Sequence, residues 1–497
     1  MAIPCEKCGY QNGERAGTGS AITSTAGQRA ALAQIDAEIL EFKEYANARI
    51  AALEEKRQSV AASLALVVYP VLTLPAEITS CFFIECLPPH GRVRPSPSRA
   101  PLLLAQVCRH WREVALFTGA LWSSFDYVLH EDELYDDMGI PPWKKSLVEC
   151  WLSRSRGHAL SWTIRRSWDE SPPIPPLSPN ILSRLWRLEV DLPEPCFNEL
   201  VPLHTPLPQL QCLAAHLAPK DLQNILRCAP QLRELNITSM DDTRYNLVSQ
   251  TIVKVEILGY IPVETFLGIL NNCPLLSHFS CQVHPTTVHN PTPTTFRSLQ
   301  SLNIVDADVL KFLTLPNLTC LEFISVKKHV FHAFVSRSSC NIRELHIIEE
   351  RDDSWEALKI PSVQTLEVNT ENKEKTLANL LRCLDPNLSS LLPQLRHLRI
   401  STLPEIDINL GRIIDMVGHR RNAANMVELQ SVSIIVELGD PEDPDAWWHF
   451  GDTIASQIRR LNSFGLKFTI QINTDDDSEV MIFPDKTVDP CKNFYLT

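Results

Sequence analysis

Residues 229–237 read APQLRELNI, and copies of this signature return throughout the second half of the chain. In most copies a proline turn precedes the Leu-rich stretch. Clear copies read LSRLWRLEV at 182–190, LPQLQCLAA at 207–215, CPLLSHFSC at 273–281, FRSLQSLNI at 296–304, LPNLTCLEF at 315–323, SCNIRELHI at 339–347, IPSVQTLEV at 360–368 and LPQLRHLRI at 392–400. Weaker copies read TIVKVEI at 251–257 and VELQSVSII at 427–435. This recurrence indicates a repeat domain.

Each repeat combines a short helix with a short strand. Helix-like stretches such as DLQNILRC precede the signatures, and alternate residues of LxxLxI point to one side of a strand. One such unit cannot bury its apolar face alone, whereas a stack of about ten units can. Most intervals between copies are about 19 to 25 residues, which is the leucine-rich-repeat range. We therefore predict an α/β fold, an irregular leucine-rich-repeat solenoid over 181–475 with parallel strands on the concave side and helices on the convex side.

The loops after the strands depart from the usual repeat. An Asn or Cys normally stands three residues after the last strand position, but here Met240 follows Ile237 and Ala307 follows Ile304. We expect backbone and water contacts to replace the side-chain ladder that normally satisfies the loop carbonyls.

The strand residue between the last two inward positions should face the concave surface. Because these residues form a mixed, charged strip, they suit recognition of a protein surface. They are Asn236, Asn303, Glu322, His346, Glu367 and Arg399.

A second segment runs from Leu72 to Trp122. It reads LTLPAEITSCFFIECLP, then a polar basic insert, then APLLLAQVCRHWREVALFTGALWSSF. A Leu-Pro turn opens a short helix at Glu77, and an apolar helix follows. The cluster is too small to bury all of its large residues, so we expect some, Trp122 among them, to stay accessible to a partner.

The order of LPAEI, FF, VCRHWR and LW closely resembles an F-box, over about a tenth of the chain. The departures are Phe82, where the family usually has Ile, and the insert over 88–101, which resembles the large fungal branch of the family. Carried over by position, the first adaptor-facing surface would be Leu74, Pro75, Glu77, Ile78, Phe82 and Phe83. The rest of the helical core and the second surface would be Leu104, Val107, Cys108, Trp111, Leu121 and Trp122.

The resemblance implies a subunit of a Skp–cullin–F-box ubiquitin ligase. The F-box would hold the Skp adaptor, and the repeats would hold an unknown client protein through the concave strip. Such a receptor makes and breaks no bond, because it works by raising the effective concentration of two partners. The alternative is a leucine-rich-repeat scaffold outside the ubiquitin pathway, in which a degenerate F-box only packs.

Composition excludes several other classes. A net charge of −13 argues against a general nucleic-acid surface, and no apolar run approaches the roughly twenty residues that span a bilayer. The 15 cysteines lack paired spacing, which favours free thiols inside the cell, in the cytoplasm or nucleus. No phosphate-binding, dinucleotide-binding or nucleophile-elbow motif occurs. We therefore predict no enzymatic activity and no cofactor.

The N-terminal region divides into a polar tail over 1–28 and a helix over 29–68. Leu32, Ile39, Ala46, Leu53 and Val60 recur every seven residues, but Arg49 and Lys56 interrupt the second half of the seam. Both a weakly self-associating coiled coil and a single amphipathic helix fit this pattern. Cys5 and Cys8 have the spacing of half a zinc site, but a structural zinc needs four ligands, so we predict no metal there. The remaining predicted segments are the F-box over 69–128, a linker and start of the solenoid over 129–180, and a C-terminal tail over 476–497.

Overall fold

The computed structural model describes most of the 497 residues. The described ranges are 25–65, 70–88, 92–129, 142–166, 177–192, 194–202, 204–238, 244–284, 292–325, 327–348, 359–369, 374–388, 391–402, 410–437, 465–473 and 478–481. Cys5 and Cys8, nearly all of the predicted N-terminal tail and most of the predicted C-terminal tail lie outside them. The chain divides into two compact units, Met1–Thr79 and Ser80–Thr497.

The first unit is dominated by one helix. Helix α1 (Thr25–Ala65) runs for 41 residues, as the absence of Pro and of interior Gly after Gly27 predicts. A 3₁₀ turn, η1 (Pro70–Thr73), follows, and helix α2 (Ala76–Glu85) begins one residue after Pro75. The long N-terminal helix that the composition predicts is therefore confirmed.

A group of short helices opens the second unit. After the second half of α2 come α3 (Leu104–Val107), α4 (Arg109–Phe117) and the 3₁₀ turn η2 (Gly119–Trp122). Cys108 separates α3 from α4 because its backbone is extended, and its Sγ atom accepts a hydrogen bond from the Trp111 backbone N–H at 3.4 Å. Cys108 is thus the N-cap of α4.

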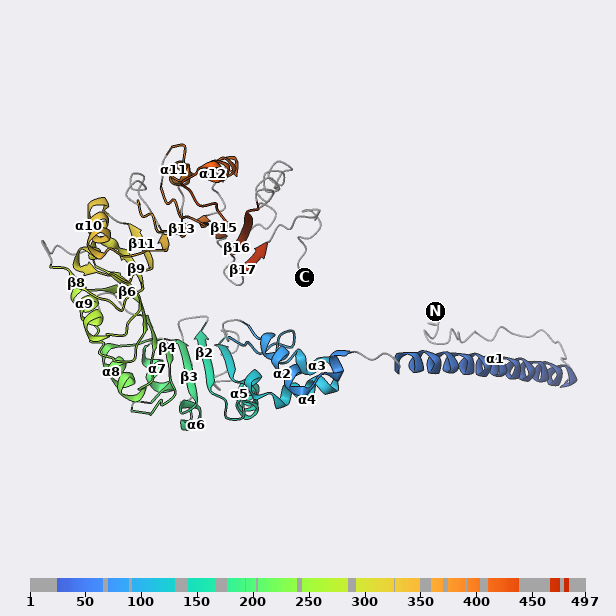
Figure 1. Cartoon of the computed structure of the whole chain (residues 1–497). Coiled ribbons are helices and arrows are strands. Elements are labelled where there is room, and N and C mark those ends of the chain that lie inside the picture. The colour runs from blue at the N-terminus through green and yellow to red at the C-terminus, as the bar shows by residue number, and fades with distance from the viewer. Residues whose placement is uncertain are drawn as a thin grey trace, which may run out of the picture. The chain divides into compact units, whose positions relative to one another are not determined.

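One long sheet forms the rest of the second unit (Figure 1). In the residues that the structure describes, fourteen parallel strands follow one another in chain order, and a last strand is antiparallel. The parallel strands are β1 (Ser124–Leu129), β2 (Leu160–Arg166), β3 (Leu185–Asp191), β4 (Cys212–His216), β5 (Glu234–Thr238), β6 (Lys254–Ile261), β7 (His278–Val283), β9 (Ser301–Asp306), β11 (Cys320–Ser325), β12 (Glu344–Ile347), β13 (Thr365–Asn369), β14 (His397–Thr402), β15 (Ser431–Glu437) and β16 (Lys467–Asn473). Strand β17 (Ser478–Met481) pairs with β16, and β8 (Thr294–Thr295) pairs with β10 (Leu313–Thr314).

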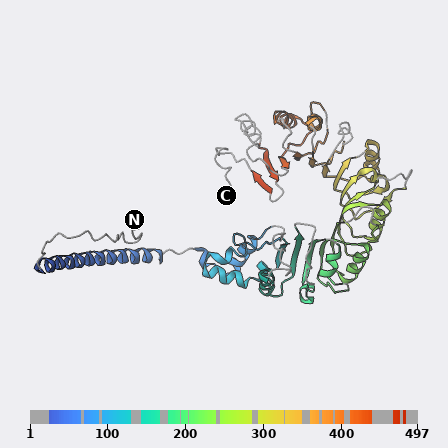
Figure 2. The same ribbon diagram turned by 180° about the vertical axis from the view of Figure 1, so that it is seen from behind.

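Helices lie between the strands and cover one face of the sheet, so that the other face is open (Figures 1 and 2). They are α5 (Pro142–Arg154), α6 (Pro179–Leu182), α7 (Glu194–Leu200), α8 (Pro219–Cys228), α9 (Val263–Asn272), the 3₁₀ helix η4 (Ala307–Phe312), α10 (Lys328–Ser338), α11 (Glu374–Leu384) and α12 (Leu410–Asn422). Every repeat signature falls on a strand from β3 to β15, which confirms the predicted helix–strand repeat. The sheet itself begins earlier than residue 181, at β1.

Alternation along each strand explains the packing. In β5, Leu235 and Ile237 are buried toward the helices, whereas Glu234 and Asn236 are accessible on the open face. Leu235 stands in register with Leu213 and Val255 on the neighbouring strands. A continuous apolar layer therefore runs beneath the sheet, and each fully buried Leu contributes about 1.5–3 kcal/mol.

Side chains of different types satisfy backbone carbonyls outside the sheet in different repeats. The Tyr245 hydroxyl donates to the Leu217 carbonyl at 3.0 Å, Arg337 Nη2 donates to Leu310 at 2.9 Å, and Arg420 Nη2 donates to Leu392 at 2.8 Å. We expected backbone and water contacts to replace the ladder in the loops after the strands. After β4, the Tyr245 side chain satisfies the Leu217 carbonyl instead.

Within the described residues, no helix is both long enough and apolar enough to cross a membrane.

Candidate functional site

The first four residues of the predicted adaptor surface surround the start of α2. Leu74 is half-buried, whereas Pro75, Glu77 and Ile78 are exposed. Ile78 and Phe82 lie four residues apart on this helix and therefore share a face.

The two adjacent phenylalanines in the second half of α2 differ in burial. Phe82 is 57% exposed, but Phe83 is buried and packs edge-on against Trp111 of α4, with ring centroids 5.0 Å apart. The Ser80 and Thr118 hydroxyls, 2.8 Å apart, add a hydrogen bond between α2 and the end of α4. The structure thus brings Phe83 and Trp111 together as core and leaves Phe82 on the surface.

Helix α3 shows the same division. Leu104 is buried in the core, whereas Val107, one turn later, is 56% exposed. Cys108 is half-buried and serves as the N-cap of α4, as described above. Of this group, Val107 is therefore the residue most available to a partner.

The prediction that Leu121 and Trp122 stay accessible is wrong. Trp122 is only 1% exposed, and Leu121 is fully buried. The Trp122 ring packs edge-on against Trp151 of α5 with centroids 4.7 Å apart, and its indole N–H donates to the Ala115 carbonyl at 2.8 Å. The prediction treated the F-box-like segment as a separate core, whereas α5 and β1 extend that core, and α5 covers Trp122. These two residues join the helices to the sheet and offer no surface.

Among the described residues that follow α1, exposed apolar side chains are concentrated in the helical segment. Between residues 78 and 117, six large apolar side chains are exposed: Ile78, Phe82, Ile84, Leu103, Val107 and Phe117. In the described residues from 118 onward, there are four: Val248, Leu258, Leu275 and Leu388. Such a concentration on a short segment is typical of an interaction surface.

The basic insert between α2 and α3 lies against the sheet. Val93 is fully buried, and its carbonyl accepts the Asp126 backbone N–H of β1 at 2.9 Å. The buried Asp126 carboxylate also pairs with Arg94 at 3.1 Å and with Arg165 of β2 at 2.5 Å. The insert therefore covers the edge of the first strand.

The open face of the sheet carries two rows of side chains in register. The first row contains the earlier open-face residue of each strand: Arg187, Cys212, Glu234, Lys254, His278, Ser301, Cys320, Glu344, Thr365, His397, Ser431 and Lys467. The second row contains the residue two positions later: Glu189, Ala214, Asn236, Glu256, Ser280, Asn303, Glu322, His346, Glu367, Arg399, Ser433 and Thr469.

All six predicted strip residues, from Asn236 to Arg399, fall in the second row. The first row was missed because we counted only the last open position of each signature. Strand period alone could have found it, since Glu234 precedes Asn236 by two residues and so shares its face.

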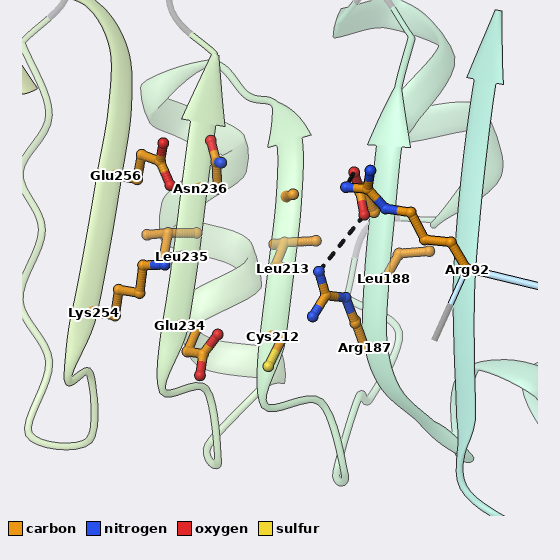
Figure 3. Close-up of a pocket in the computed structure, with 12 residues that line it drawn as sticks. Arg92, Arg187, Leu188, Cys212, Leu213, Glu234, Leu235, Asn236, Lys254 and Glu256 are labelled. Carbon is orange, nitrogen blue, oxygen red and sulfur yellow. Dashed lines mark hydrogen bonds and ion pairs between the residues drawn. The ribbon is translucent and has the colours of Figure 1, made fainter. Parts of the chain in front are cut away.

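A hollow of about 240 Å³ lies on the open face over β3 to β6 (Figure 3). Its polar lining alternates in charge, with the cations Arg92, Arg187 and Lys254 and the acids Glu189, Glu234 and Glu256. Arg92 reaches it from the insert and pairs with the Glu189 carboxylate at 2.5 Å, and Arg187 lies 3.8 Å from the same carboxylate. No local sequence signal could have found Arg92, because 97 positions separate it from Glu189.

Cys212 is one of the residues that line this hollow. Burial, and next the neighbouring Glu234 carboxylate, raise the pKa of its thiol to about 11. The thiol is therefore protonated at neutral pH and is a poor nucleophile. With balanced charges and a protonated thiol, the hollow is suited to binding polar groups.

Further along the open face, His346 lies among carboxylates. Its Nδ1 atom is 3.6 Å from Glu322 Oε2, and its Nε2 atom is 3.9 Å from Glu367 Oε2. Interaction with Glu322 in the first place, opposed by burial, raises the pKa of the imidazole. Arg399 pairs with Glu367 at 3.4 Å and ends this charged run of the second row.

The regular succession of strand and helix defines an α/β repeat solenoid of leucine-rich-repeat-like architecture. No family model matches the chain, and no curated protein is significantly similar to it.

Proposed function

We propose that this protein is a non-catalytic substrate receptor of a Skp–cullin–F-box ubiquitin ligase inside the cell. The helical segment holds the Skp adaptor, and the open face of the sheet holds a client protein. The proposal rests on the F-box-like order of residues in this segment. The observation that carries it is the concentration of exposed apolar side chains between residues 78 and 117.

The residues that carry the F-box resemblance fall into two groups, one packed in the helical core and one exposed. Phe83, Leu104 and Trp111 are the helical core, and Ile78, Phe82 and Val107 are the side chains left to contact an adaptor. Burial of exposed Phe and Val side chains in an interface supplies affinity of the kind that hot spots give. The surface is therefore centred on α2 and α3, without Leu121 and Trp122.

The open face supports the second half of the proposal. Its two rows carry acids, bases and amides on a rigid sheet, and a charged hollow lies near its N-terminal end. Such a surface recognises a client by charge complementarity rather than by apolar burial. The client's own polar and charged side chains would pair with the rows.

Binding of a purified Skp adaptor to the full chain tests the proposal. Val107→Glu places a carboxylate on the proposed surface, so we expect affinity to fall at least about tenfold, equivalent to about 1.4 kcal/mol. Phe82→Glu should do the same. Val248→Glu is the matched control because Val248, in the segment between β5 and β6, is exposed to a similar degree (53%). Undiminished binding by both surface variants would contradict the proposed adaptor-binding surface.

The second candidate is a repeat scaffold whose helical segment only caps the sheet. The burial of Leu121 and Trp122 and the edge-covering insert favour it. Under this alternative, no binding of the unmodified chain to the adaptor would be measured.

A further inference from the structure

Three metal-ligating side chains of different chemistry gather on β11 and β12. Cys320 Sγ, a Glu344 carboxylate oxygen and a His346 ring nitrogen all lie within 4.8 Å of one another. The register explains the cluster, since Cys320 and Glu344 are direct partners and His346 follows two residues later on the same face. The cluster is the one group of this kind in the described part of the chain.

The donor set matches the preference of zinc. Zn²⁺ binds thiolate, imidazole and carboxylate at about 2.0–2.3 Å in a tetrahedron, so its ligand atoms lie roughly 3.3–3.8 Å apart. Side-chain movements of about 1 Å would bring three atoms now within 4.8 Å to such spacing. Small rotations suffice because Cys320 and His346 are half-buried and Glu344 is exposed.

The surroundings of His346 favour a bound cation. A carboxylate lies at each ring nitrogen, Glu322 at Nδ1 and Glu367 at Nε2. Whichever nitrogen binds the metal, the other has an acid to orient it, as is common for metal-bound histidine. Three carboxylates, of Glu322, Glu344 and Glu367, surround His346, and Arg399 pairs with one of them, Glu367, so the local field attracts positive charge.

We propose that Cys320, Glu344 and His346 form a binding site for a zinc-type divalent cation on the open face of the sheet. With three protein ligands, the fourth position stays open to water or to a donor group of a bound molecule. The site does not depend on the function proposed for the helical segment.

A cobalt titration of the metal-stripped full chain tests this site, because Co²⁺ replaces Zn²⁺ and is coloured. A Cys5→Ser, Cys8→Ser background removes the other sequence with metal-ligand spacing. We expect one equivalent of Co²⁺ to produce a thiolate-to-cobalt charge-transfer band, and Zn²⁺ to displace it. Cys320→Ser should abolish the band. His346→Asn should weaken Co²⁺ binding at least about 100-fold, because removing a residue that only hydrogen-bonds to a metal ligand already costs up to about 100-fold.

The sheet supplies the matched control. Cys212 is another first-row cysteine, and its strand partner Glu234 corresponds to Glu344. Cys212→Ser should therefore leave the band unchanged. The proposal is overturned if no charge-transfer band forms, if the band survives Cys320→Ser, or if Cys212→Ser removes it.

Helix α1 independently carries a second inference. A stripe along this helix is apolar apart from Arg57, and its side chains are exposed apart from the half-buried Ala46. The stripe contains Leu32, Ile35, Ile39, Phe42, Ala46, Ile50, Leu53, Arg57, Val60 and Leu64. Steps of three and four residues alternate, apart from one extra step of four between Ala46 and Ile50. That step is a stutter, which keeps the stripe on one side of a nearly straight helix. With the stutter, Arg49 and Lys56 leave the seam, and Arg57 alone interrupts it.

The charges beside the stripe fit a parallel pair of identical helices. In a parallel coiled coil, a residue on one flank meets the partner residue five positions later on the other flank. Glu38 would then meet the partner's Lys43, and Arg49 would meet the partner's Glu54. Both contacts are attractive. We infer that a second copy of this chain covers the stripe, with the two helices parallel and in register.

Light scattering of the full chain at micromolar concentration tests the pairing. We expect a dimer, which Ile39→Asp should weaken at least about tenfold, since it buries a charge in the seam. Leu40→Asp is the control because Leu40 is also exposed (59%, against 46% for Ile39) but lies off the stripe. Glu38→Lys should weaken the dimer, and adding Lys43→Glu should restore it. A monomeric chain, or equal effects of the two Asp variants, overturns the inference.

Discussion

Two places on the open face have the same backbone frame and different chemistry. At β4 and β5, Cys212 faces Glu234, and Asn236 follows. At β11 and β12, Cys320 faces Glu344, and His346 follows. In both pairs a first-row cysteine meets a first-row glutamate. The second-row residues differ, because Ala214 and Asn236 at the first place correspond to Glu322 and His346 at the second.

The residues on the neighbouring strands add a difference in charge between the two places. Arg187 and Lys254 flank the first cysteine–glutamate pair, whereas Ser301 and Thr365 flank the second. The cations next to Cys212 lower its thiol pKa slightly, against the larger effects of burial and Glu234. The pKa of the Cys320 thiol is also raised, first by burial and then by Glu344 and Glu322, with no cation among the causes. The fold repeats the positions, and the open-face residues set what each position can bind.

The largest expected effect is on folding stability, because the same backbone arrangement buries a leucine at both places. Leu235 and Leu345 lie between the two rows on β5 and β12, and both are fully buried. Replacing either by Ala should cost about 2–5 kcal/mol of folding free energy, by similar amounts, because each leaves a cavity in the same layer. Denaturant unfolding measures both. As a control, Thr365→Ala on the open face should change the free energy by about 0.5 kcal/mol or less. A cost below about 1 kcal/mol at one leucine would show that the two places are not packed alike.

Two substitutions on β5 and β6 should create a second metal-binding site at the Cys212–Glu234 pair. Asn236→His together with Lys254→Thr reproduces the β12–β13 residues on β5 and β6, so we expect a second equivalent of Co²⁺ to bind. Arg187 remains nearby and repels cations, so this binding should be at least about tenfold weaker than at His346. Spectroscopic titration gives both stoichiometry and affinity. Asn236→Gln adds no strong ligand and serves as the control. Unchanged stoichiometry in the double variant would show that the strand arrangement and these two substitutions are not enough to bind Co²⁺.

The last prediction concerns the reactivity of the Cys212 thiol. Its pKa of about 11, against an ordinary 9.0, reduces the thiolate about 100-fold at any pH below both values. Alkylation of this residue at pH 8 should therefore be slow and should accelerate as the pH rises toward 11. Peptide mass spectrometry after timed treatment with iodoacetamide follows the residue. Glu234→Gln should raise the rate, since it removes a negative neighbour, and a rate independent of pH would contradict the assignment.

Repetition made most of the fold predictable. A signature such as APQLRELNI contains a turn, buried leucines and a strand, and its recurrence implies parallel stacking. Period-2 alternation likewise placed Asn236 and His346 on one row. These inferences need only local rules, applied many times.

Contacts between distant segments were not predictable in this way. Trp122 is covered by Trp151, which belongs to a helix that the F-box-like segment does not include. The Cys320–Glu344–His346 group depends on strand register, which joins adjacent repeats. Arg92 enters the hollow from an insert with no regular pattern. In each case the partner is fixed by three-dimensional packing, which sequence spacing does not record.

The insert has a practical consequence for dissecting the molecule. Its Val93 carbonyl accepts the Asp126 backbone N–H, and Arg94 helps neutralise the buried Asp126 carboxylate. A fragment that starts after residue 128 would lack this cover and β1 as well, and would present the unprotected flank of β2 to solvent. Open flanks of this kind template the pairing of further chains, so such truncated preparations should precipitate. Fragments made for crystallisation or binding work should retain the insert.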